Sequence, residues 1–402
     1  VFFMNKLKNI GISALAGTLV SLSAAQAGGV SVSGVYELSY TNLHHDEVSG
    51  NKLGVKKNIS FGAGGDLSDG GGVTWATNIG WTDGADLSSA SIAINMGGIA
   101  TLTYDSGGGG TGANAVDNIV PTAWEEVDYG FSTGISDVGA VSASKGVVNL
   151  TVKAPVSGTG FSLSYVNRMG GDHVSDGGVQ GVGTGVAGVD LVLDVVDYDA
   201  AHFGFRWGMA AQTELHDVTC ERNNTRMKVG TTNSYASCND GLKHNPYGAS
   251  MFTKLQLGPI HLGTQATFKN LATTKSTAIM NTRSIVSGAA LVFGDTLSLS
   301  YGVAWDKNRY NDRNRGLGAQ AVAEAAIANE CTYGASDLIN CREIRGGDEH
   351  EYITTKYRGW SAALNIGPVA LKGTTNHADS GEKSGIYEHG TSHSELNLSI
   401  AF

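Results

Sequence analysis

The chain has 402 residues, of which 57 are glycine and 5 are proline, and only 16% of its residues are charged. Acidic residues outnumber basic ones by 37 to 27, and the net charge of −10 argues against a nucleic-acid partner, which would need a basic face. The hydrophobic share of 41% excludes a disordered chain. Neither a linker nor a block of charge divides the sequence into domains.

The N-terminal residues have the pattern of a secretory signal peptide. A basic segment at 4–8 precedes a modest apolar stretch at 10–22, and Ala25-Gln26-Ala27 is a small-residue cleavage site. We therefore predict a signal peptide with upstream residues over 1–27 and a mature domain over 28–402. A transmembrane anchor is the weaker alternative, because the apolar stretch is short and no later run approaches the ~18 apolar residues of a membrane helix.

The mature chain alternates between apolar and polar residues with a period of two, which is typical of half-buried strands. The pattern is clear at both ends: Val30, Val32, Tyr36 and Leu38 near the start, and Leu396, Leu398, Ile400 and Phe402 at the end. It predicts roughly sixteen strands. Their expected spans are 29–41, 54–65, 73–82, 88–96, 99–104, 147–154, 160–169, 189–197, 202–212, 247–257, 260–269, 280–293, 296–306, 351–366, 369–375 and 391–402.

The predicted connections alternate between tight turns and long polar loops, so the turns gather at one end of the sheet. So many long strands need closure, since open edges aggregate. Apolar faces that turn to lipid, with small polar residues lining a water-filled lumen, fit a transmembrane antiparallel β-barrel. A soluble β-rich protein is the alternative. A signal peptide followed by such strands indicates the outer membrane of a Gram-negative bacterium.

Three segments of the chain resemble the Gram-negative general porins. Residues 57–71, followed by 73–80, look like the second hairpin of that family, and 147–155 with 160–165 look like its sixth and seventh strands. The C-terminal alternation ending in Phe402 is similar to the tail by which the barrel-assembly machinery recognises its substrates. The resemblance implies a homotrimer of sixteen-stranded barrels in lipid and lipopolysaccharide, with the third long loop folded into the lumen.

That third loop corresponds to residues 105–146. It is rich in acidic residues, and in the family its carboxylates face basic side chains of the barrel wall across the narrowest point of the pore. The predicted loop acids are Asp105, Asp117, Glu125, Glu126 and Asp128. The alternation predicts inward basic residues at Lys56, Lys153, Arg168, Arg206, Lys254, Lys269 and Lys372, of which the first five are our predicted basic wall. Asn58 stands where the family often has arginine, so we expect a mild cation preference.

Cysteines and enzyme motifs add little to this interpretation. Four cysteines in an exported chain favour disulfides within long loops, and the candidates are Cys220, Cys238, Cys331 and Cys341, with the pairing open. The G-x-G-x-x-G match at 183–188 precedes a strand instead of following one, so it does not predict a nucleotide site. The histidine pair at 44–45 is more typical of polar surface than of a metal site. We predict no enzymatic activity, no cofactor and no metal.

The function that these features predict is passive diffusion of small hydrophilic solutes and ions through a water-filled channel. Two alternatives stay open. One is a substrate-selective outer-membrane channel, which would show saturable transport. The other is a structural or adhesive barrel with a closed lumen, which would conduct nothing.

Overall fold

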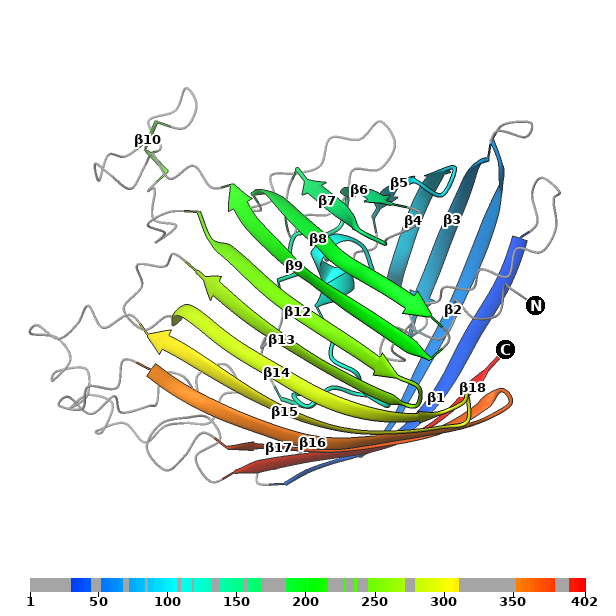
Figure 1. Ribbon diagram of the computed structural model, residues 1–402, viewed down its shortest axis with the longest axis vertical. Coiled ribbons are helices and arrows are strands. Elements are labelled where there is room, and N and C mark those ends of the chain that lie inside the picture. Colours follow the sequence, from blue (N-terminus) through cyan, green and yellow to red (C-terminus); the bar gives the residue numbers. More distant parts are fainter. Residues whose placement is uncertain are drawn as a thin grey trace, which may run out of the picture.

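A computed structural model shows a closed antiparallel β-barrel of sixteen strands (Figure 1). The structure describes residues 30–44, 52–67, 72–83, 86–106, 110–117, 119–131, 138–154, 158–167, 169, 186–200, 202–215, 227–228, 235–236, 245–271, 279–310, 352–379 and 390–402. The predicted signal peptide, the four cysteines and Arg168 lie outside these residues. Within them, no helix has the length and apolar character to cross a membrane.

Each strand pairs with its neighbours in chain order, and β1 closes the ring by pairing with β18. The barrel strands are β1 (Val30–His44), β2 (Leu53–Asp66), β3 (Val73–Thr82), β4 (Asp86–Met96), β5 (Ala100–Asp105), β6 (Val147–Lys153), β7 (Gly160–Val166), β8 (Ala187–Ala200), β9 (Phe203–Leu215), β12 (Tyr247–Leu257), β13 (Ile260–Asn270), β14 (Ile279–Phe293), β15 (Leu297–Tyr310), β16 (Tyr352–Ile366), β17 (Val369–Asp379) and β18 (Thr391–Ala401). A separate two-stranded sheet, β10 (Met227–Lys228) and β11 (Tyr235–Ala236), lies within the predicted loop between β9 and β12.

The alternation predicted from the sequence places apolar side chains on the outside of the barrel. Residues such as Val30, Trp360 and Ile366 are 62–68% exposed there. Small polar side chains on the inner wall are at most 6% exposed: Asn149, Ser164, Gln265, Ser300, Ser361, Asn376 and Asn397. An apolar exterior around a polar interior is the arrangement of a transmembrane barrel, because the closed ladder satisfies every strand edge within lipid. The predicted fold class is confirmed.

The first and last strands close the barrel through a contact of the C-terminal residue. Gly34 and Phe402 exchange two backbone hydrogen bonds, with N···O distances of 2.9 and 3.0 Å. Gly34 occupies an outward position, and the ring of Phe402 takes the space where a side chain of residue 34 would lie. An aromatic ring that covers a strand glycine restores part of the packing that the glycine lacks.

The short turns use glycine where the backbone needs a left-handed conformation. Gly258, between β12 and β13, has a φ of 55°, and Gly367, between β16 and β17, has a φ of 59°. Residues other than glycine rarely adopt such values. The turns at this end are therefore tight.

The predicted strand limits are right for β3 and β12 and too short for several others. β17 continues to Asp379, four residues beyond the predicted end at 375. Its outward positions there are Thr375, His377 and Asp379, so the apolar signal stops before the strand does. β7 is shorter than predicted and ends at Val166.

Candidate functional site

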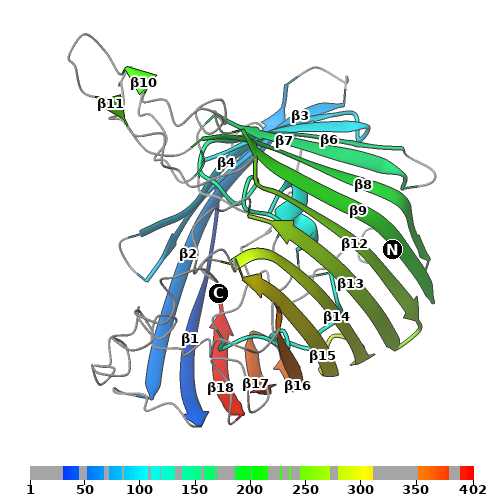
Figure 2. The ribbon, with the colours of Figure 1, turned by 90° about the vertical axis from the view of Figure 1, so that its left-hand side faces the viewer.

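The segment between β5 and β6 runs through the inside of the barrel, as the resemblance predicted. Its 3-10 helix, η2 (Gly112–Val116), lies within the ring of strands in both ribbon views (Figure 2). Backbone N–H groups along the segment donate to inward side chains of β8, β9, β13, β15 and β16. We call residues 110–117, 119–131 and 138–146 the inner loop.

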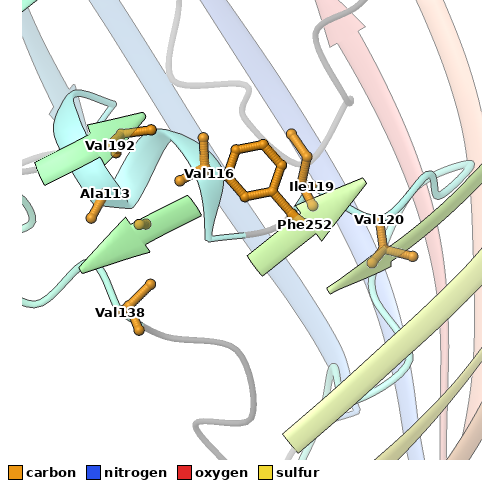
Figure 3. Close-up of a cluster of buried hydrophobic side chains, with 8 residues drawn as sticks. Ala113, Val116, Ile119, Val120, Val138, Val192 and Phe252 are labelled. Carbon is orange, nitrogen blue, oxygen red and sulfur yellow. The ribbon is translucent and has the colours of Figure 1, made fainter. Parts of the chain in front are cut away.

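The first half of the inner loop, together with Val138 from its last segment, is held mainly by apolar contacts. Val116, Ile119 and Val138 pack with Phe252 of β12 and Val192 of β8, and all five are at most 8% exposed. Figure 3 shows Phe252 projecting from its strand between Val116 and Ile119. Among the described residues this cluster is larger than the two other buried apolar clusters, and most of the other described apolar side chains point outward. Its burial fixes the loop against the wall.

Side-chain hydrogen bonds supplement these contacts at the same wall. The N–H of Ala113 donates to Asp190 Oδ1 at 3.2 Å, and the N–H of Ile119 donates to Gln265 Oε1 at 3.4 Å. A backbone that leaves regular structure inside a barrel must find such acceptors, because an unpaired buried N–H is costly. The wall residues therefore replace the partners that a strand would have supplied.

Polar groups of β15 to β18 hold the second half of the inner loop, together with a smaller apolar cluster in which Val127 packs with Ala304, Tyr357 and Ala378. The N–H of Trp124 donates to Ser361 Oγ at 2.7 Å. Asn376 Nδ2 donates to the carbonyls of Glu126 and Tyr129 at 2.8 and 3.1 Å, and the Tyr129 hydroxyl donates to Glu395 Oε2 at 3.0 Å. One amide side chain thus binds two loop carbonyls, and we call Asn376 the amide clamp.

Glycines on the inner wall leave the space that the inner loop occupies. A Cβ at Gly263 would collide with the ring of Pro121, and one at Gly288 would lie 2.7 Å from Val120. A Cβ at Gly302 would lie 3.1 Å from Val127. These glycines interrupt the inward polar pattern of three neighbouring strands. Sequence reasoning did not assign them a role, although glycine recurring at inward positions was a usable signal.

Charged side chains surround the second half of the loop where it approaches β1, β2, β17 and β18. We define the loop charge cluster as Glu37, Lys56, Glu125, Lys372 and Glu395. Lys372 Nζ lies 3.7 Å from Glu37 Oε1 and 5.9 Å from the centre of the Trp124 ring. Glu125 is within electrostatic range of the other four members. Opposite charges therefore face one another between loop and wall.

Burial raises the pKa of Glu125 to about 7, and the nearby Glu395 carboxylate acts in the same direction. The ammonium groups of Lys372 and Lys56 act against this rise. Glu125 therefore exchanges its proton in the neutral range. It is negative above that pH and neutral below it.

The other predicted loop acids do not share this position. Glu126 is surrounded by Asp128 and Asp117, and burial raises its pKa well above the ordinary value. Asp105 is the last residue of β5 and is 5% exposed. The loop is thus less negative at its surface than its composition suggests, and Glu125 is the member that faces the predicted basic residues Lys56 and Lys372.

The remaining predicted basic residues lie on another part of the wall. Lys153 Nζ is 3.0 Å from Asp197 Oδ2, and Arg206 makes contacts of 2.9 and 2.8 Å through Nε and Nη2 with Asp194 Oδ1. Lys254 lies near Arg206, with Asp199 and Asp197 in its surroundings. We call this set, on β6, β8, β9 and β12, the paired wall.

A bulge in β8 completes the paired wall. The register between β8 and β9 shifts between Asp194 and Val196, so Asp197 pairs with Arg206 on the inner face. Strict alternation from Val189 would have turned Asp197 outward. The bulge moves this carboxylate inward, where it meets Lys153. Periodicity alone does not reveal such an inserted residue.

No family model matches this chain, and no curated protein matches it by sequence. Solved structures do match it in three dimensions. OprB of Pseudomonas putida aligns with a TM-score of 0.57 at 12% identity, over 94% of each chain. OmpF of Salmonella typhi aligns with a TM-score of 0.56 at 10% identity, over 94% of this chain and 98% of that one.

The trimer form of OmpT, an outer-membrane protein of Vibrio cholerae, aligns with a TM-score of 0.55 at 8% identity, over 94% of this chain and 100% of that one. The chain has the fold of the general porins. At these identities the likeness concerns the fold. It does not identify the solute or the roles of individual residues, which have to be argued from the residues of this chain.

Proposed function

We propose that this protein is an outer-membrane channel through which small hydrophilic solutes and ions diffuse passively. The observation that carries the proposal is the inner loop, which is pinned to the wall of a closed barrel and brings Glu125 among the charges of β1, β2, β17 and β18. A loop that only covered the outside of the barrel would not need inward glycines, amide clamps and an apolar anchor. Such a loop narrows a passage while keeping it polar.

Solvent exposure of inward charges supports an aqueous lumen. Lys56 points inward from β2 and is exposed, and the side chain of Arg206 retains 25% of its exposure. Charged side chains that remain hydrated inside a barrel avoid the cost that they would pay in hydrocarbon. A plugged structural barrel would bury all of its inward charges, as Lys372 is buried here beside the inner loop at 4% exposure.

We infer a mild cation preference from the loop charge cluster. Its three carboxylates outnumber its two ammonium groups, whereas basic and acidic residues of the paired wall largely neutralise one another. Because Glu125 titrates in the neutral range, the preference should increase from pH 6 to pH 8. The size of the pore and the charges that line it would determine which solutes pass.

Assembly follows from the same proposal. The trimer form of a structural neighbour and the exposed C-terminal Phe402 support a trimer in lipid, recognised by the barrel-assembly machinery through its last strand. Residues 1–27 would direct export of the chain and would then be removed as a signal peptide. In the long loops, disulfides would form among Cys220, Cys238, Cys331 and Cys341.

Recording from planar bilayers tests the proposal. We expect stepwise conductance in groups of three, without saturation as solute concentration rises, and a reversal potential in a salt gradient that has the sign of cation preference. Saturable conductance with block by one solute would favour a selective channel, and complete silence of a folded barrel would favour a structural role. Clear anion selectivity would contradict the inference from the cluster.

A further inference from the structure

The part of the inner loop that approaches β16 and β18 carries a cluster of rings. We call Trp124, Tyr129, Phe131, Tyr357 and His393 the lumen aromatic cluster. The ring centres are 5.3 Å apart for Tyr129 and His393, 5.9 Å for Phe131 and Tyr357, and 6.3 Å for Trp124 and Tyr129. Phe131 also lies 6.4 Å from His393. The rings therefore form one continuous cluster that joins the loop to the wall.

Gly130 allows the loop to place a ring on each side of it. Its φ of 88° is in the left-handed region, and a Cβ at this position would overlap the ring of His393. The backbone of Gly130 therefore packs directly against the imidazole. The rings of Tyr129 and Phe131 contact the same imidazole at interplanar angles of 75° and 70°. Three consecutive loop residues thus build the centre of the cluster.

Part of the cluster is open to the interior of the barrel. Trp124, Tyr357 and His393 are at most 5% exposed, and they form its covered base. Tyr129 and Phe131 are half-buried. Because both lie on the inner loop, within the ring of strands, the surface that they leave uncovered faces the lumen.

Carboxylates lie beside the open rings. The hydroxyl of Tyr129 donates to Glu395 Oε2 at 3.0 Å, and Glu125 and Glu37 are within electrostatic range of the same hydroxyl. The face of an aromatic ring attracts cations through its negative quadrupole. Rings next to carboxylates therefore attract a positively charged group for two reasons, and they repel an anion.

Lys372 shows the same chemistry at the covered end of the cluster. Its ammonium lies 5.9 Å from the centre of the Trp124 ring and 3.7 Å from Glu37 Oε1, in a side chain that is 4% exposed. A buried ammonium is thus held between an aromatic face and a carboxylate. Tyr129 and Phe131 extend this combination of rings and carboxylates into the open part of the barrel.

We propose that Tyr129, Phe131 and Glu395 form a subsite for organic cations, namely solutes that carry an alkylated ammonium group. The subsite rests on the proposed function, because it assigns a class of solute to the same pore. Methyl groups on the nitrogen contact the ring faces directly, and recognition of quaternary ammonium by aromatic rings follows from this geometry. The contact is brief, because a solute that passes through a channel must also leave each site.

Binding of choline to the folded barrel tests the subsite. Saturation-transfer nuclear magnetic resonance measures the dissociation constant in a maltoside detergent, which carries no ammonium group. The comparison is the neutral isostere of choline, in which carbon replaces the nitrogen. We expect the isostere to bind about fivefold more weakly than choline, the contribution of one cation–π contact. Equal binding of the two probes overturns the assignment to cations.

Two variants of Tyr129 separate its ring from its hydrogen bond. Y129L and Y129F both lose the hydroxyl that donates to Glu395, and Y129F keeps the ring. We expect Y129L and F131L each to weaken choline binding by about fivefold, and Y129F to retain it within about twofold. Equal losses in Y129L and Y129F would assign the effect to the hydrogen bond that positions the loop, and would overturn the subsite.

Tyr40→Leu is the matched control. Tyr40 is paired in register with Leu396, next to Glu395, but its ring is on the outer face of the barrel and is 46% exposed. Y40L should leave choline binding unchanged, whereas E395Q should weaken it by about fivefold and leave binding of the neutral isostere unaltered. A loss in Y40L as large as that in Y129L, or unchanged choline binding in E395Q, contradicts the proposal.

Conductance of potassium chloride separates the subsite from the proposed function. A barrel that conducts potassium chloride but does not prefer choline to its isostere overturns the subsite alone. A barrel that binds choline through Tyr129 and Phe131 but never conducts overturns the channel alone.

Discussion

Apolar packing and hydrogen bonds hold both parts of the inner loop, but in different proportions. Residues around η2 are anchored by burial of Val116, Ile119 and Val138 against Phe252. Residues 122–131 combine a smaller apolar cluster, in which Val127 packs with Ala304, Tyr357 and Ala378, with directional groups, chiefly Asn376 and Glu395, and bring Glu125 among opposing charges. The comparison teaches that the part around η2 serves as the apolar anchor, whereas the part around Glu125 places a titratable carboxyl among charged side chains of the wall.

Filling the inward glycine space should have the largest effect on this arrangement. Gly288→Leu places a bulky side chain where Val120 now packs, so the loop must move or the barrel must strain. We expect either an increased single-channel conductance or a loss of about 1–3 kcal/mol in stability, as for other overpacked sites. Bilayer recording and thermal unfolding measure the two outcomes.

Gly373→Leu is the control for this change, because Gly373 is an outward position where an added Cβ would have no atom closer than 3.7 Å. It should leave conductance unchanged. Identical behaviour of the two variants would mean that the loop does not depend on the wall glycine.

Removing the amide clamp should have the next largest effect. Asn376→Leu deletes the two part-buried hydrogen bonds to the carbonyls of Glu126 and Tyr129, each of which contributes about 0.5–1.5 kcal/mol. We expect the polar half of the loop to loosen while the apolar half stays in place. The readout is flickering of the open channel together with protease cleavage near residues 126–130.

Asn365→Ala provides the comparison, since that amide donates to the carbonyl of Asp295 in a turn and not to the loop. A steady open channel in N376L would show that the clamp does not hold the loop. Cleavage within residues 112–120 in that variant would show that the two halves are not independent.

Titration of Glu125 should produce a moderate effect that is specific to the polar half. With a pKa of about 7, its carboxylate is ionised at pH 8 and mostly protonated at pH 6, so cation preference rises between these values. Glu125→Gln should flatten this dependence. Reversal potentials in a salt gradient at several pH values measure it.

Glu126→Gln should change the same titration much less, because burial keeps the pKa of Glu126 well above its ordinary value. A pH profile that is unaltered in E125Q would locate the titrating group elsewhere in the lumen.

Neutralising single wall lysines should produce the smallest effects. These variants also show whether the loop charge cluster or the paired wall has the larger influence on ion selectivity. Lys56→Gln removes a cation that opposes Glu125, whereas Lys153→Gln removes one that is paired with Asp197 at 3.0 Å. Exposed ion pairs contribute about 0–1 kcal/mol, so neither change should unfold the barrel. We expect a larger shift of reversal potential in K56Q, and an equal or larger shift in K153Q would refute the division between cluster and paired wall.

Several residues show where sequence reasoning reached its limit. Periodicity predicted β12 over 247–257 because every second residue there faces lipid, and lipid imposes the same demand along the whole strand. It ended β17 at 375, so it missed Asn376, whose strand continues with polar residues on both faces. Parity placed Lys153, Arg206 and Lys254 on the inner face, but it gives the face of a side chain and not its position around the ring.

The amino-acid sequence by itself determined the barrel, its number of strands and the inward direction of most charges, since these follow from a local pattern that a lipid exterior enforces residue by residue. Only the tertiary structure decided which wall meets which half of the loop. That outcome depends on strand register, on the bulge before Val196 and on closure between Gly34 and Phe402, which bring together residues far apart in the chain. The position of Glu125 near Lys56, Lys372 and Glu395 results from closure of the barrel, and no local sequence pattern predicts it.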